Sequence, residues 1–247
     1  MEVLSFYVGI IGNIISVLMF LSPVGTFRRI IKRRSTEEFE SLPYICTLLN
    51  SSLWTYYGII KPGELLVATI NGFGILVETV YVTLFLIYAP KRLRAKIAMV
   101  VGMLDVGLLA AAILVTRLAL KGEARIDAIG ILGAVLNIMM YSSPLAAMRT
   151  VVRSKSVEYM PFFLSFFLFF NGGTWAFYAL LVHDYLLLVP NGCGFVLGAA
   201  QLVVYAIYRK ANQRKNVSDT LVDEEGCQHE RLIISSSSLS HEIINGD

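Results

Sequence analysis

Seven stretches of the chain are almost free of charge, and each is long enough to cross a lipid bilayer. Five contain no Asp, Glu, Lys or Arg, and the other two carry one acid each, Glu78 and Asp105. The stretches are Val3–Leu21, Leu42–Ile60, Leu65–Tyr88, Ile97–Thr116, Ala128–Met148, Met160–Val182 and Tyr185–Tyr208. They are 19 to 24 residues long, and a helix needs about 20 apolar residues to span the hydrocarbon core. The sequence therefore predicts an all-α membrane protein with seven transmembrane helices.

The basic residues gather on one side of this predicted membrane. The loops after spans 1, 3 and 5 and the C-terminal tail hold 17 of the 21 Lys and Arg residues. Such segments stay in the cytosol, so an odd number of spans puts the N-terminus outside the cell or in a lumen and the C-terminus in the cytosol. Plasma membrane and vacuolar membrane both remain open. Because the basic loops are short and carry no interleaved stacking aromatics, no nucleic-acid partner is expected.

The chain contains two copies of one three-helix unit. With an offset of 121 residues, GIIGNIISVLMFLSP (Gly9–Pro23) aligns with GILGAVLNIMMYSSP (Gly130–Pro144), and NSSLWTYYG (Asn50–Gly58) aligns with NGGTWAFYA (Asn171–Ala179). Three spans reverse the chain direction, so one extra span is needed to restore it. We predict two parallel three-helix bundles (3+1+3) joined by an inversion linker helix, a transporter arrangement. The predicted segments are 1–90 (first repeat), 91–124 (linker), 125–208 (second repeat) and 209–247 (disordered cytosolic tail).

These motifs resemble the SWEET (MtN3/saliva) family of plant-type eukaryotic sugar facilitators over about residues 5–208. The specific pieces are Ser-Pro at 22–23 and 143–144, the loop runs RRSTEEFESLPY and RSKSVEYMPF, and Asn-Gly at 71–72 and 191–192. The related PQ-loop carriers of amino acids would have Pro-Gln where this chain has Pro23-Val24 and Pro144-Leu145, which favours sugar. The resemblance implies a bidirectional uniporter of a small neutral sugar that works by alternating access. It implies no enzymatic activity and no cofactor, and it makes a homo-oligomer an expectation.

Two tryptophans and two asparagines fall in one layer between the midplane and the outer face. Trp54 and Asn71 each lie six residues from the outer end of a span, about 9 Å deep at about 1.5 Å per residue, and Trp175 and Asn191 are at matching depth. An amide both donates and accepts hydrogen bonds, and an indole offers a flat face to a sugar ring. We predict these four residues as substrate-binding; in the SWEET family the asparagines of spans 3 and 7 line the sugar pocket. The alternative is that Asn only ties helices together, and the glycines after each Asn serve either close packing or helix rocking.

Two methionines are expected to narrow this pocket. Met19 and Met140 lie one helical turn before Pro23 and Pro144. Their length, beside two indoles, favours a monosaccharide such as glucose over a disaccharide.

Four prolines lie at the predicted cytosolic ends of the spans: Pro23, Pro43, Pro144 and Pro161. Proline removes a backbone hydrogen bond and bends a helix. The resemblance implies that they form the hinges of a cytosolic gate, whereas an ordinary helix start also explains Pro43 and Pro161.

At the opposite end, Tyr57 and Asp184 are candidates for an extracellular gate in which a phenol donates a hydrogen bond to a carboxylate. In the SWEET family a Tyr–Asp pair at these positions closes the outer side. The alternatives are an interfacial tyrosine and a solvated loop aspartate.

Other functions of a seven-helix chain are less consistent with the sequence. A proton-coupled PQ-loop carrier would use Glu78 or Asp105, but neither acid has a counterpart in the other repeat and no span contains a His. We therefore expect structural roles for both acids. A seven-helix receptor would not have tandem repeats, and the last span contains no Lys that could bear a retinal. An intramembrane enzyme would need a nucleophile–base or metal-ligand pattern, and no metal site is predicted.

Overall fold

The computed structural model describes residues 2–157, 160 and 162–209, and within these ranges all regular structure is helical. The helices are α1 (Glu2–Leu21), α2 (Val24–Arg33), α3 (Leu42–Ile60), α4 (Leu65–Tyr88), α5 (Lys91–Val101), the π-helical η1 (Gly102–Leu108), α6 (Leu109–Ala119), α7 (Glu123–Met140), α8 (Ser142–Ser154), α9 (Phe162–Leu181) and a last helix, Tyr185–Arg209. The predicted tail beyond Arg209 and Pro161 lie outside the described residues.

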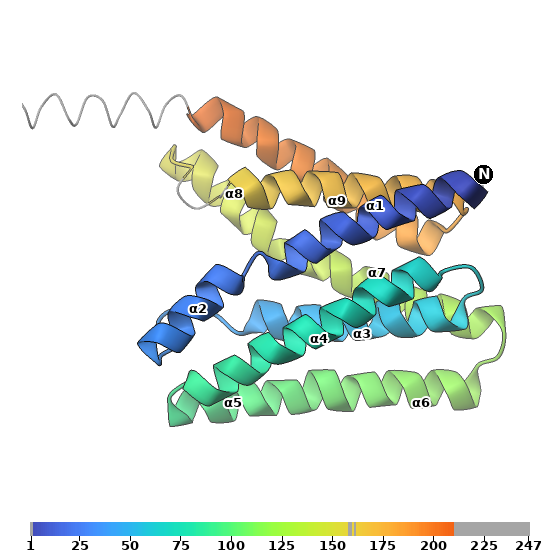
Figure 1. Ribbon diagram of the computed structural model, residues 1–247, viewed down its shortest axis with the longest axis horizontal. Coiled ribbons are helices and arrows are strands. Elements are labelled where there is room, and N and C mark those ends of the chain that lie inside the picture. Colours follow the sequence, from blue (N-terminus) through green and yellow to red (C-terminus); the bar gives the residue numbers. More distant parts are fainter. Residues whose placement is uncertain (1, 158–159, 161, 210–247) are drawn as a thin grey trace, which may run out of the picture.

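Six of the described helical segments are long and apolar enough to cross a membrane, when α1 and α2, α5 with η1 and α6, and α7 and α8 are each counted as one segment. The seventh is α3, which has 19 residues and no charged side chain. Its mean hydropathy is lowered by the polar run Asn50, Ser51 and Ser52. Because α3 runs beside α4 over its length (Figure 1), it crosses the same layer.

The predicted loops after spans 1, 3 and 5 are wrong in part, because most of their basic residues lie on helices; Arg34 and Lys155 directly follow α2 and α8. Arg28 is on α2, Arg94 on α5 and Arg149 on α8. Each of these helices begins at or next to a proline: α2 follows Pro23, α5 follows Pro90 and α8 has Pro144 in its first turn. The first turn of a helix tolerates proline, since its backbone N–H would have no partner there. Figure 1 shows the resulting break between α1 and α2.

The two repeats contact each other through two matched helix pairs. α1 of the first repeat packs against α9 of the second, and α3 of the first packs against α7 of the second. Within the first repeat, α4 lies against both α1 and α3, and the linker (α5, η1 and α6) packs along α3 and α4. The interface between the repeats therefore has an approximate twofold relation, as the parallel-repeat prediction requires.

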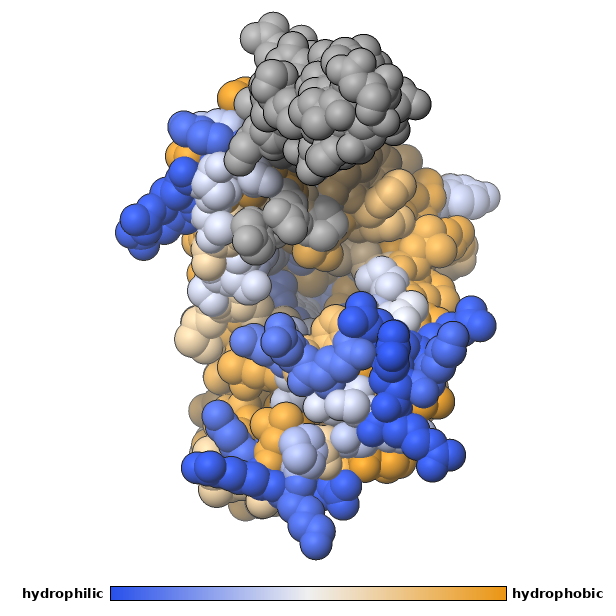
Figure 2. Space-filling model, turned by 90° about the vertical axis from the view of Figure 1, so that its left-hand side faces the viewer, coloured by the Kyte–Doolittle hydropathy of each residue, from blue (hydrophilic) through white to orange (hydrophobic). Residues whose placement is uncertain are grey.

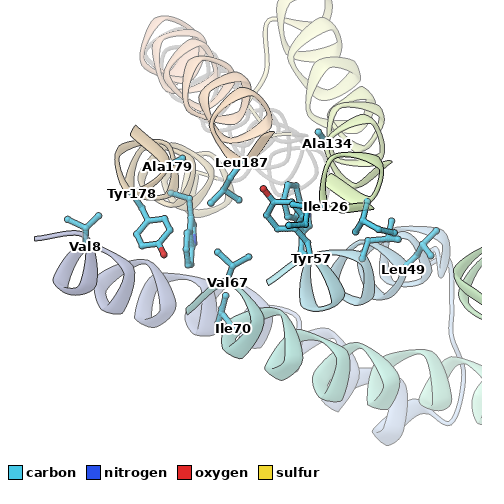
Figure 3. Packing of buried hydrophobic residues seen from close by; sticks show 14 residues of the cluster. Val8, Leu49, Tyr57, Val67, Ile70, Ile126, Ala134, Tyr178, Ala179 and Leu187 are labelled. Carbon is cyan, nitrogen blue, oxygen red and sulfur yellow. The ribbon is translucent and has the colours of Figure 1, made fainter. Parts of the chain in front are cut away.

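Two buried clusters hold this arrangement together. One joins both repeats near the end at which the N-terminus lies, and it includes Trp54, Tyr57, Trp175 and Tyr178. In Figure 3, Tyr57 and Tyr178 lie on either side of Val67 and Leu187. The other cluster fixes α2 to the first bundle, where the Phe27 ring stacks on Tyr81 with centroids 4.1 Å apart.

Candidate functional site

A cavity of about 520 Å³ lies between the two repeats. Its lining includes all six residues predicted to bind substrate, namely Trp54, Asn71, Trp175, Asn191, Met19 and Met140. It also includes Pro23 and Pro43, which belong to the end of the molecule that carries α2 and α8. Figure 2 looks at this end, and hydrophilic side chains surround a hollow there.

Each indole of the cavity rests on a glycine of the other repeat. A Cβ added to Gly133 would lie 3.1 Å from Trp54, and one added to Gly12 would lie 3.0 Å from Trp175. The two glycines are related by the offset of 121, as are the two tryptophans. Both rings are nearly buried. The absence of a side chain at these glycines lets each ring lie directly on the opposing helix, so the site is built from both halves.

Asn71 and Asn191 have the same hydrogen-bonding arrangement. Asn71 Nδ2 donates to the Val67 carbonyl at 2.9 Å, and Asn191 Nδ2 donates to the Leu187 carbonyl at 2.8 Å. Each bond stays within its own helix, so neither asparagine ties two helices together. Within the described residues, the carboxamide oxygens make no further protein hydrogen bond, although both side chains line the cavity. Each amide can therefore accept and donate a bond to a ligand.

The glycines that follow these asparagines differ in what surrounds them. A Cβ on Gly74 would lie 2.5 Å from the Phe20 ring, and one on Gly194 would lie 2.5 Å from the Tyr141 hydroxyl. A Cβ on Gly72 or on Gly192 would meet no atom within 4 Å. In each repeat the second glycine after the asparagine, Gly74 or Gly194, therefore serves close packing.

Two polar pairs that the sequence analysis missed cross between the repeats beside the cavity. Ser16 Oγ donates to Asn171 Oδ1 at 2.6 Å and accepts a hydrogen bond from Trp175 Nε1 at 3.0 Å. In the related position, Asn50 Nδ2 donates to Asn137 Oδ1. The offset of 121 matches Ser16 with Asn137 and Asn50 with Asn171. The repeat relation was the one signal in the sequence for these pairs. Predicting which side chains bond across the repeats also requires knowing which helices meet.

At the end of the molecule near the N-terminus, hydrogen bonds join the two repeats. Tyr57 donates to Asp184 Oδ2 at 2.8 Å, and Lys61 Nζ lies 2.7 Å from the same oxygen. Asp184 Oδ1 accepts the Leu187 backbone N–H at 3.1 Å, and Asp184 is 1% exposed. The predicted Tyr57–Asp184 contact is thus present in the structure, and Lys61 joins it.

A second tyrosine–carboxylate pair, also missed in the sequence, lies beside the first. Tyr178 donates to Glu64 Oε2 at 3.0 Å, and both residues are buried. Burial and the negative charge of Asp184 raise the pKa of the Glu64 carboxyl. Tyr178 is the repeat counterpart of Tyr57, and Glu64 is that of Asp184 at an offset of 120.

The prolines and buried acids occupy distinct places. Pro23 caps the start of α2, and Pro43 lies in the first turn of α3. The Pro144 carbonyl accepts a hydrogen bond from Gln201 at 3.3 Å. Glu78 lines the cavity and Asp105 lies in η1; within the part of the chain that the structure describes, the buried Oε2 of Glu78 and both carboxylate oxygens of Asp105 have no hydrogen-bond partner. Among the described residues, no group of His, Cys, Asp and Glu is placed to hold a metal ion.

Comparison with known proteins leads to the same family as the sequence motifs. Residues 6–93 and 127–213 match the family described as "Sugar efflux transporter for intercellular exchange". The chain is 62% identical to the bidirectional sugar transporter SWEET17 of Arabidopsis thaliana over 225 residues, which cover 90% of this chain and 93% of that protein. It is 58% identical to SWEET16 of the same plant, covering 90% and 95%.

A solved structure of a eukaryotic SWEET transporter superposes with a TM-score of 0.81 at 40% identity, covering 85% of this chain and 98% of that one. This likeness confirms the predicted seven-helix membrane fold. The relatives are named transporters, in agreement with the prediction that the chain is not an enzyme. The chain therefore belongs to the SWEET (MtN3/saliva) family.

Proposed function

We propose that the chain is a bidirectional uniporter that carries a small neutral sugar down its gradient by alternating access of the two bundles. The observation that carries this proposal is the cavity between the repeats, into which each repeat contributes one Trp, one Met and at least two Asn, among them the matched pair Asn71 and Asn191. The relatives' names, bidirectional sugar transporters, support the same substrate class.

The cavity suits a neutral polyol in its chemistry. Asn71 and Asn191 each offer an accepting oxygen and a donating N–H, while the indoles supply apolar surface. Lys and Arg are absent from the described lining, so an anionic substrate would have no counter-charge there. The bonds from Asn71 and Asn191 to their own helices favour ligand contact over the helix-tying alternative.

Alternating access requires the cavity to open to one side at a time. In the structure the cavity reaches the end that carries Pro23 and Pro43, while Tyr57 and Asp184 join the two repeats at the other end. We propose that the four prolines act as hinges of the cytosolic gate and that Tyr57 and Asp184 form the outer gate. This assignment places the N-terminus outside or in a lumen, and the C-terminus in the cytosol, of a plasma or vacuolar membrane. Self-association stays a prediction.

The distinguishing test is radiolabelled glucose counterflow in proteoliposomes, with and without a pH gradient. A uniporter gives counterflow without any pH gradient. Counterflow that requires the gradient would instead support the proton-coupled alternative and a role for Glu78 or Asp105.

Substrate size provides a second prediction. Met19 and Met140 both line the cavity, so the double substitution Met19→Ala and Met140→Ala enlarges it from both repeats. We expect the ratio of sucrose to glucose counterflow to rise about tenfold or more, within the range that small changes in pocket size produce. Met139→Ala is the matched control, because Met139 is an exposed neighbour of Met140 outside the cavity lining. Sucrose counterflow equal to that of glucose in the unmodified chain would refute the monosaccharide proposal.

A further inference from the structure

The outer end of the molecule contains two tyrosine–carboxylate pairs with different electrostatic surroundings. Both pairs cross between the repeats: Tyr57 of α3 bonds Asp184, and Tyr178 of α9 bonds Glu64. All four residues are at most 3% exposed. If the repeats separate here to admit a sugar, both hydrogen bonds must break. The two tyrosine–carboxylate pairs would therefore open and close together.

Asp184 has a cation within ion-pair distance, whereas the positive charge of Lys61 acts on Glu64 only from beyond that distance. The Asp184 carboxylate has bonds from Tyr57, Lys61 and the Leu187 backbone. The Glu64 carboxyl has one, from Tyr178, and no cation of the described chain lies within ion-pair distance of it.

The difference originates at one position of the repeat. Lys61 follows the last residue of α3 and donates its backbone N–H to the Tyr57 carbonyl, whereas Val182 follows α9 and does the same to the Tyr178 carbonyl. The second repeat therefore has valine where the first has the cation.

We propose that Glu64 and Tyr178 form a second outer latch, and that protonation of Glu64 closes it, so that acid on the outer side holds the transporter shut to that side. This inference rests on the proposed outer gate at Tyr57 and Asp184. A carboxylate without a cation is costly to bury, whereas its protonated form keeps the bond from Tyr178 without that cost.

The sign of the pH effect follows from the two states. In the closed state, burial and Asp184 raise the pKa of Glu64, whereas in an open state water would surround the carboxyl. The closed state then binds the proton more tightly, so the fraction of closed transporter rises as pH falls through the raised pKa. Each unit of difference in pKa changes the ratio of open to closed states by at most about tenfold.

Lys61, Tyr178 and Asp184 act directly on Glu64, and Tyr57 interacts with both Glu64 and Asp127. The elements packed nearby carry further titratable groups: His183 precedes Asp184, and α1, which packs against α4, carries the exposed Glu2 and Tyr7. The test must separate Glu64 from these groups.

The test measures the distance between spin labels at Ile59 and Leu180, which are exposed, related by the repeat and near the outer ends of α3 and α9. The full-length chain, with its three cysteines replaced and Cys at the two label sites, is held in lipid nanodiscs between about pH 5 and about pH 8, a range that brackets a raised carboxyl pKa. In this background we expect the open fraction to grow as pH rises.

Two substitutions should remove that response. Glu64→Gln keeps an acceptor for Tyr178 without a titrating group, and it should stay closed throughout. Val182→Lys supplies the missing cation, and it should also stay closed, with Glu64 ionised. His183→Asn is the control and should keep the response of the parent chain. Tyr178→Phe should increase the open fraction at every pH.

An unchanged pH response in Glu64→Gln would overturn the second latch. The variant Asp184→Asn separates this from failure of the underlying gate. If Asp184→Asn opens the outer side while Glu64→Gln and Val182→Lys respond to pH like the parent chain, only the second latch is refuted. If Asp184→Asn leaves the distances unchanged, the proposed gate itself is refuted.

Discussion

Replacing Asn191 with alanine is expected to lower glucose counterflow about 10- to 100-fold, with little loss of stability. The asparagine side chain lines the cavity, and its one protein bond goes to its own helix at Leu187. Removing the amide takes away a donor and an acceptor for sugar hydroxyls, and a lost hydrogen bond at a desolvated site costs about 1–3 kcal/mol. Asn71→Ala should have a comparable effect, because its bonding is the same.

Asn13 offers the matched control for these substitutions. It is also an asparagine within a span, but it is outside the cavity lining, and its Nδ2 lies 2.9 Å from the Gly9 carbonyl and 3.3 Å from the Leu66 carbonyl of α4. Asn13→Ala should lower thermal stability in detergent and retain counterflow. If counterflow by Asn191→Ala equals that of the unmodified chain, the assignment of the site is wrong, while the fold stands.

Asp184→Asn is expected to weaken the outer closure most, since one side chain joins three partners. The substitution removes the charge that faces Lys61 and weakens the bond from Tyr57. Hydrogen bonds to charged groups contribute about 1.5–3 kcal/mol, which corresponds to a shift of roughly 10- to 150-fold between closed and open states. Counterflow should fall, because transport requires both states to be populated.

The double substitution with Lys61→Met serves as the control for this effect. Asp184→Asn alone leaves the partly buried Lys61 ammonium without its anionic partner, and such an unpaired charge is more costly than a missing pair. Counterflow by the double variant should therefore exceed that of Asp184→Asn alone. Tyr57→Phe removes the bond donated to Asp184 and the bond accepted from Lys61 but keeps the ion pair between Lys61 and Asp184, so it should have a smaller effect. Equal counterflow by all three variants and the unmodified chain would argue against an outer gate at these residues.

Much of the fold could be predicted because membrane spans depend on local composition. The predicted spans Leu42–Ile60 and Leu65–Tyr88 coincide with α3 and α4. The helix beyond Pro23 was missed because a proline after an apolar run suggests an end, whereas here it lies just before the first turn of α2. The predicted span Ala128–Met148 runs past Pro144, and the structure divides it there into α7 and α8. Composition alone does not distinguish a proline that ends a helix from one that begins the next.

The site was partly predictable because the repeat relates its halves. Matching Trp54 with Trp175 and Asn71 with Asn191 needed only the offset between the copies. The bond between Asn50 and Asn137 could not be predicted in this way, because it depends on α3 meeting α7 across the interface. Glu64 was missed because the run KPGELL has the composition of a solvated loop, although packing of both repeats buries it.

The central claim is that one sugar site is shared between the repeats, and intrinsic fluorescence tests it directly. Trp54 and Trp175 are the only tryptophans of the chain, and both line the cavity. A glucose titration of the purified protein should change the emission of Trp54→Phe and of Trp175→Phe with the same midpoint, and Asn71→Ala or Asn191→Ala should move that midpoint to higher glucose. Emission that stays unchanged in a protein that still transports glucose would contradict the account.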